Sequence, residues 1–107
     1  MINLYNARLQ AEKLRDCAVD LSNCNSIIDN SMSQIASADN KTAGPVRNAL
    51  GFEKEKITKA IDKLYEIASY IENRSNDIYN EELEAAREAA RRREEERRRR
   101  EESRRNR

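Results

Sequence analysis

Apolar residues recur every seven positions along the first third of the chain. Five of them share one heptad position: Ala7, Leu14, Leu21, Ile28 and Ile35. Three and four residues after members of this set stand Cys17, Cys24, Ala11, Ala18 and Met32. An apolar stripe of this width is typical of a helix that packs in a bundle. The pattern therefore predicts a helix over about residues 4–35.

The spacing of the two cysteines limits which disulfides this helix allows. Cys17 and Cys24 lie two helical turns apart, roughly 10 Å, whereas a disulfide needs Cα atoms within about 7 Å. A straight helix therefore excludes a disulfide within the chain. We expect both thiols to lie in the buried seam, as free cysteines usually do. The alternative is an intermolecular disulfide across a dimer.

A break follows at residues 36–45, which read ASADNKTAGP. Asp, Asn, Gly and Pro each favour a turn for their own reason. Pro45 suits the first turn of a second helix, and Thr42 is the expected cap just before it. The predicted turn motif is Thr42, Gly44 and Pro45.

A second seven-residue repeat follows this turn, at Leu50, Ile57, Leu64, Ile71 and Ile78. The polar residues Asn73, Ser75 and Asn76 mark a soft place in this second helix. Two seams of similar length on either side of one turn predict an antiparallel hairpin over residues 1–83. The predicted fold class is all-α, a two-helix hairpin with a long charged helical extension, which completes a helical bundle with a partner.

Apolar residues beyond the two seams are the reason to expect that partner. The candidates for partner binding are Leu9, Val19, Ile27, Ile61 and Tyr65. The alternative is that the tyrosine rings lie flat on the hairpin surface and need no partner.

The tail over residues 84–107 has a different composition. It holds eleven arginines and seven glutamates, whereas residues 1–83 hold ten basic and thirteen acidic side chains. Glutamates stand four residues before arginines, a spacing that supports an isolated helix by about 0.2–0.5 kcal/mol per pair. We expect a solvated charged helix that continues the second one.

The composition and the missing motifs also indicate which kinds of catalytic and ligand-binding chemistry to expect. The chain has no histidine, and it shows no Gly-rich phosphate loop and no nucleophile elbow. We therefore expect no enzyme activity, no catalytic residues, no cofactor, no metal and no small-molecule substrate. No run of about 18 apolar residues appears, and the start of the chain lacks the pattern of a Sec signal peptide, so we expect no membrane insertion.

Nucleic-acid binding through the arginine-rich tail is a weaker hypothesis. Affinity for phosphates grows with the number of basic contacts, but glutamates pair with most of these arginines. No aromatic residue is interleaved to stack on bases. We therefore rank a nucleic-acid partner below a protein partner.

The hairpin resembles the small WXG-type helical hairpins of type VII secretion, in particular the divergent helical partners of LXG toxins. Gly44 matches the glycine of the turn motif, and Val46, Ala49 and Leu50 match the start of its second helix. Thr42 stands where the family has tryptophan, which favours the divergent branch.

The family's export signal is a tyrosine followed four residues later by an acidic residue. Tyr79 lies in the expected place, but Leu83 stands at the acidic position and the nearby acidic residues are Glu81 and Glu82. The candidate export region is therefore Tyr79 with Glu82, which departs from the strict motif.

The resemblance implies a chaperone or targeting factor that binds the N-terminal helical domain of a larger effector toxin. It is also compatible with a second small helical partner. It also implies a cytoplasmic protein, or one secreted by a leaderless type VII route. Two alternatives stay open. One is a self-associating homodimer, either a secreted hairpin or a structural coiled coil, and the other is a nucleic-acid-associated protein.

Overall fold

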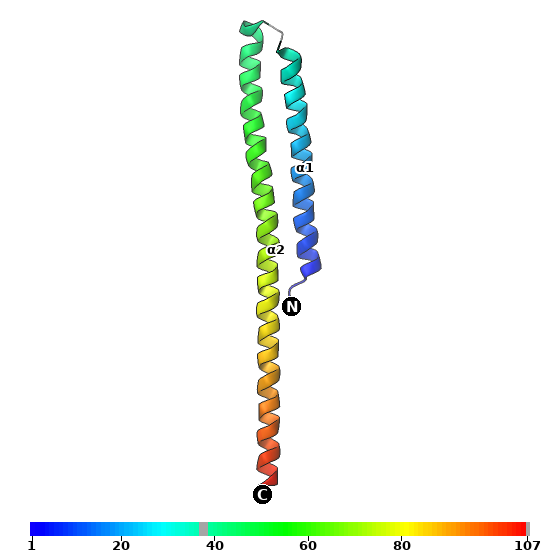
Figure 1. Ribbon diagram of the computed structural model, residues 1–107, viewed down its shortest axis with the longest axis vertical. Coiled ribbons are helices and arrows are strands. Elements are labelled where there is room, and N and C mark those ends of the chain that lie inside the picture. Colours follow the sequence, from blue (N-terminus) through cyan, green and yellow to red (C-terminus); the bar gives the residue numbers. More distant parts are fainter. Residues whose placement is uncertain (37–38, 107) are drawn as a thin grey trace.

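The chain folds into two antiparallel helices of unequal length (Figure 1). The computed structural model describes residues 1–36 and 39–106, in which helix α1 spans Leu4–Ile35 and helix α2 spans Asn40–Arg105. No strand occurs in these two ranges. The molecule measures 101 × 17 × 11 Å. The predicted all-α class and the two helices are confirmed.

Helix α1 begins with a cap and depends on packing along its length. The side chain of Asn3 accepts a hydrogen bond from the Asn6 amide at 3.1 Å, which satisfies one of the free donors of the first turn. The Ser26 and Ser33 hydroxyls donate to the carbonyls one turn earlier, a bond that competes with the helix ladder. A helix with such residues is held mainly by the helix it packs against.

Helix α2 begins earlier than the sequence indicated, so the predicted turn motif is wrong. Thr42, Gly44 and Pro45 all lie inside the helix, and Asp39 rather than Thr42 is the cap. The Asp39 carbonyl accepts from the Ala43 amide at 2.7 Å, and Ala43 is buried. Because Asp39 caps the helix and Ala43 is buried, α2 has more than one turn before Pro45. The part of the predicted turn at residues 37–38 lies outside the described residues.

Three contacts between α1 and α2, and one between the residues preceding α1 and α2, fix how the helices are aligned. Their hydrogen-bonded pairs are Ile2 with Glu82, Arg15 with Glu72, Asn25 with Thr58, and Asp29 with Lys54. The two residue numbers in each pair add to between 83 and 87. This antiparallel register places Ala18 level with Ala68, and Ala11 level with Ser75.

The seam between the helices is built from small side chains. The buried residues within the described ranges are Ala7, Ala11, Ala18, Ala43, Ala68 and Ser75. Small residues let two helices approach to the lower end of the usual 8–10 Å separation. The Leu and Ile residues of both heptad repeats stay half-buried beside them.

The prediction that the cysteines lie in the seam is wrong. Cys17 and Cys24 are both exposed and free. The seam follows Ala11 and Ala18 instead, because their methyl groups permit the closer helix approach and turn the cysteine positions toward one side of the hairpin.

Asn25 is a polar residue in this seam. Its amide nitrogen donates to the Thr58 hydroxyl at 3.1 Å, while its buried Oδ1 has no hydrogen-bond partner among the described residues. A single asparagine in a helical seam costs stability but favours the register in which its amide is bonded. Asn25 thus favours the observed alignment over one shifted by a heptad.

The smallest dimension of the molecule, 11 Å, is about the diameter of one helix. The hairpin is therefore a single layer, and neither of its broad faces is covered. Beyond Glu82, α2 continues without a partner helix to Arg105 (Figure 1).

The alanine seam makes a stability prediction. Ala18 is fully buried, so Ala18→Leu should push the helices apart and lower the free energy of unfolding by about 1–3 kcal/mol. Urea unfolding followed by circular dichroism measures the change. Ala90→Leu, on the exposed tail, is the matched control and should leave stability nearly unchanged; equal effects of the two changes would contradict the close-packed seam.

Candidate protein-binding surface

The described residues offer open surfaces and no metal site. They contain no group of three or more His, Cys, Asp or Glu residues placed to hold a metal ion. Three open grooves lie along α2, and one of them is also lined by Met32 of α1. The broad faces of the hairpin carry most of its exposed large apolar side chains.

The two faces differ in their chemistry. One carries the ion pairs that cross between the helices, Arg15 with Glu72 and Asp29 with Lys54. Helical periodicity places Tyr5 and Val19 of α1, and Tyr65 and Tyr79 of α2, on this same side. We call it the tyrosine face.

The register aligns the four apolar residues of the tyrosine face in two pairs. Val19 lies level with Tyr65, and Tyr5 lies level with Tyr79. Tyr5 is 74% exposed, Val19 50% and Tyr65 42%, whereas Tyr79 is half-buried. The two pairs are fourteen residues apart, roughly 21 Å along the helix.

An ion pair lies between these two apolar sites. The Arg15 guanidinium donates to both carboxylate oxygens of Glu72, at 2.6 and 3.0 Å. The hydrogen bond from Arg15, and then its charge, lower the pKa of Glu72, against the opposing effect of desolvation. The same hydrogen bond raises the pKa of Arg15, so both members of the pair are charged near neutral pH.

The other predicted partner-binding residues are dispersed. Ile27 is 65% exposed but lies on the opposite face, and Leu9 lies on the outer edge of α1. Ile61 is half-buried in the seam, level with Asn25. The structure therefore brings Val19 and Tyr65 together and separates the other three from them.

The predicted export region has a structural contact of its own. The Glu82 carboxylate accepts a hydrogen bond from the Ile2 amide at 2.8 Å and lies 4.0 Å from the Met1 ammonium nitrogen. It ties the start of the chain to α2, next to the half-buried Tyr79.

The opposite face carries a second row of residues on α2. They follow alternating steps of three and four, a spacing that keeps side chains on one side of a helix. We call this row the α2 stripe: Val46, Ala49, Glu53, Lys56, Ala60, Lys63, Ile67 and Tyr70. On α1, periodicity places Cys17, Cys24 and Ile27 on the same side.

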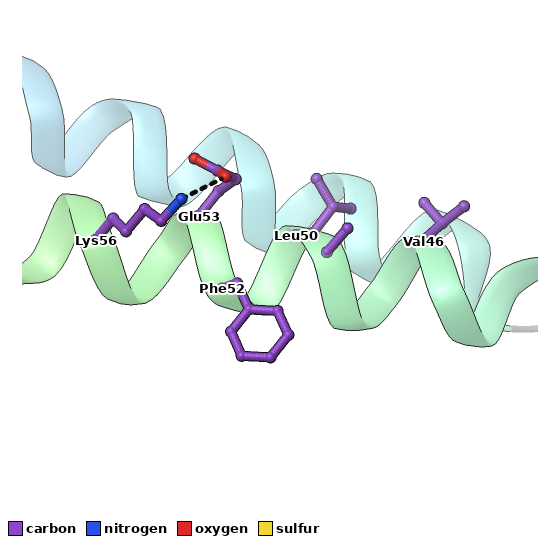
Figure 2. A pocket seen from close by; sticks show the side chains of 6 residues that line it. Val46, Leu50, Phe52, Glu53 and Lys56 are labelled. Carbon is purple, nitrogen blue, oxygen red and sulfur yellow. Dashed lines mark hydrogen bonds and ion pairs between the residues drawn. The ribbon is translucent and has the colours of Figure 1, made fainter.

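Two of the grooves lie on the α2 stripe, one at each end. The first is lined by Val46, Ala49, Leu50 and Phe52, with the Glu53–Lys56 ion pair at its border (Figure 2). The Phe52 ring points away from α1 and is 65% exposed (Figure 2). The second is lined by Ile67 and Tyr70 between Lys63 and Glu66.

Sequence reasoning missed much of this apolar surface. Tyr5, Val46, Phe52, Ile67 and Tyr70 are all exposed, yet none was among the predicted binding residues. For Tyr5 and Phe52 no simple signal set them apart. The three-and-four spacing from Val46 to Tyr70 was the one pattern that could have revealed the stripe.

The tail carries its own ion pairs. Arg97 contacts Glu94 at 2.6 Å and Glu101 at 3.4 Å, and Arg91 and Arg92 both contact Glu88. These are exposed pairs, each of which contributes little alone, but together they support a helix that has no other packing.

Comparison with known proteins adds no identity. No protein-family model, curated protein or solved structure matches the chain. Within the described residues, neither helix contains a segment apolar enough to cross a membrane.

The Arg15–Glu72 pair makes a pH prediction. A carboxyl whose pKa is lowered by folding stabilises the protein above its ordinary value of about 4.3, and this contribution is lost as the pH falls through the lowered pKa. Glu72→Gln should therefore destabilise the protein near neutral pH and flatten the loss of stability between about pH 5 and pH 3.

Thermal unfolding at several pH values measures this effect, with Glu66→Gln as the exposed control. If the two variants show the same pH profile, the cross-helix pair does not contribute to stability.

Proposed function

We propose that this protein is a non-enzymatic helical adaptor, which binds the N-terminal helical domain of a larger effector and presents it for export by a type VII route. The observation that carries the proposal is the incomplete core. No side chain larger than alanine or serine is buried among the described residues, while ten large apolar side chains are exposed.

The energetics favour binding. Fully burying a leucine, isoleucine or tyrosine-sized side chain is worth about 1.5–3 kcal/mol, and half-buried seam residues gain only part of this. A two-helix layer is therefore marginal alone, and a partner helix that covers one face would supply the missing burial.

The tyrosine face fits an amphipathic partner helix. It offers two apolar sites, each made of one residue from α1 and one from α2, with a charged pair between them. A tyrosine at such a position supplies a large contact area, and its hydroxyl group can stay hydrated at the edge of an interface. The resemblance of Val46, Ala49 and Leu50 to the second helix of the hairpin family is the ground for assigning the partner to a secretion effector.

Site-specific cross-linking tests this proposal. A photoreactive phenylalanine analogue at Tyr65 should cross-link in the native cell to one larger protein, and mass spectrometry should locate the link in a helical N-terminal region. The same analogue at Lys59, on the outer edge of α2, is the matched control.

A charge placed on the face gives the second measurement. Val19→Lys should weaken binding of the identified protein at least about tenfold, because it puts a charge into an apolar site, with the helix content unchanged. Cross-links from Tyr65 that reach only other copies of this chain, or no protein at all, would refute the adaptor function.

A further inference from the structure

The α2 stripe has a symmetric order of side chains. Val46 and Ala49 form one apolar end, and Ile67 and Tyr70 form the other. Val46 is 47% exposed, Ile67 38% and Tyr70 67%. Between these ends lie Glu53, Lys56, Ala60 and Lys63. A groove with an apolar lining lies at each end.

This order is complementary to itself when the stripe is reversed. An antiparallel copy centred at the level of Thr58 places Val46 opposite Tyr70 and Ala49 opposite Ile67. Glu53 then faces Lys63, and the twofold symmetry forms each of these contacts twice. Apolar residues meet apolar residues at both ends and Glu53 meets Lys63 between them, while Lys56 faces Ala60 at the centre.

Neighbouring registers fail. A shift of one heptad in one direction places Val46 opposite Lys63, and a shift in the other direction places Val46 opposite Asp77. Either shift puts the exposed Val46 side chain against a charge and loses the contact between the two apolar ends. The sequence of the stripe thus selects one alignment.

We propose that the face bearing the α2 stripe binds a second copy of this chain, with the two α2 helices antiparallel about Thr58. The register of the hairpin places Ile27 of α1 at the same level, so its exposed side chain meets its own counterpart across the axis. Every neighbouring pair of helices in this four-helix bundle is antiparallel.

The charges at the centre allow this contact. Glu53 is paired with Lys56 of its own chain at 3.2 Å, and Lys63 with Glu66 at 3.7 Å, all four largely exposed. In the dimer each of these pairs gains a partner of opposite sign. The stripe is about 36 Å long and the hairpin is 17 Å wide, which gives a face of about 600 Å² per copy and corresponds to a modest interface.

Charge reversal tests the alignment. In sedimentation equilibrium from about 1 to about 200 µM, the unaltered full chain should dimerise with a dissociation constant in the micromolar range. Glu53→Lys and Lys63→Glu should each weaken the dimer at least about tenfold, because like charges then face each other. The double variant should restore most of the affinity.

The control is Glu55→Lys, on the other side of α2, which should leave the dimer unchanged. A chain that stays monomeric over the whole range, or a double variant no better than the single ones, overturns the proposal.

Disulfide trapping gives a second readout. In a background of Cys17→Ala and Cys24→Ala, Ile27→Cys should form an intermolecular disulfide under mild oxidation, and Val19→Cys on the tyrosine face should not. Equal yields from the two positions would refute the twofold arrangement. Because Val19 and Tyr65 lie on the opposite face, loss of effector binding and loss of the dimer are separate outcomes.

Discussion

Contact between small side chains holds α1 against α2, and the other features of the molecule follow from it. Alanine at Ala11, Ala18 and Ala68 lets the helix axes come close but leaves little apolar volume to bury. The half-buried leucines and isoleucines border this line rather than form a core of their own. A hairpin joined in this way is one layer thick, and its two faces are left to interact with something else.

The two faces are distinguished by how the helices cross-link. Ion pairs and the Asn25–Thr58 hydrogen bond gather on the tyrosine side, where they fix the register. The α2 stripe has no such cross-helix pair among the described contacts. The helices are thus joined by side-chain bonds on the tyrosine face, and a partner could cover the α2 stripe without breaking any of those bonds.

Much of the fold followed from the heptad spacing alone. It located α1 at residues 4–35 and identified the long second helix, because a period near 3.5 has few other structural solutions. It could not decide between Cys17 and Ala18 for the seam, since both are small and apolar. That choice depends on how close the second helix comes. Pro45 pointed to a helix start, whereas the helix begins at Asn40, after the Asp39 cap, and Ala43 is buried.

The binding surface was harder to foresee for the same reason. Ser75 was a soft position in the sequence, yet it is buried level with Ala11, where only a small side chain fits. The alignment of Val19 with Tyr65, or of Tyr5 with Tyr79, requires the register between residues about fifty or more positions apart. No local pattern contains that information.

The unbroken passage of α2 from the hairpin into the tail has a mechanical consequence. From Glu82 to Arg105 the helix extends about 35 Å past the last contact with α1, stiffened by its own ion pairs. A rotation of the hairpin by about 10° on a bound protein would swing the far tip by about 6 Å. The charged rod therefore acts as a lever arm, which converts a small change of angle at the hairpin into a displacement at its distal arginines.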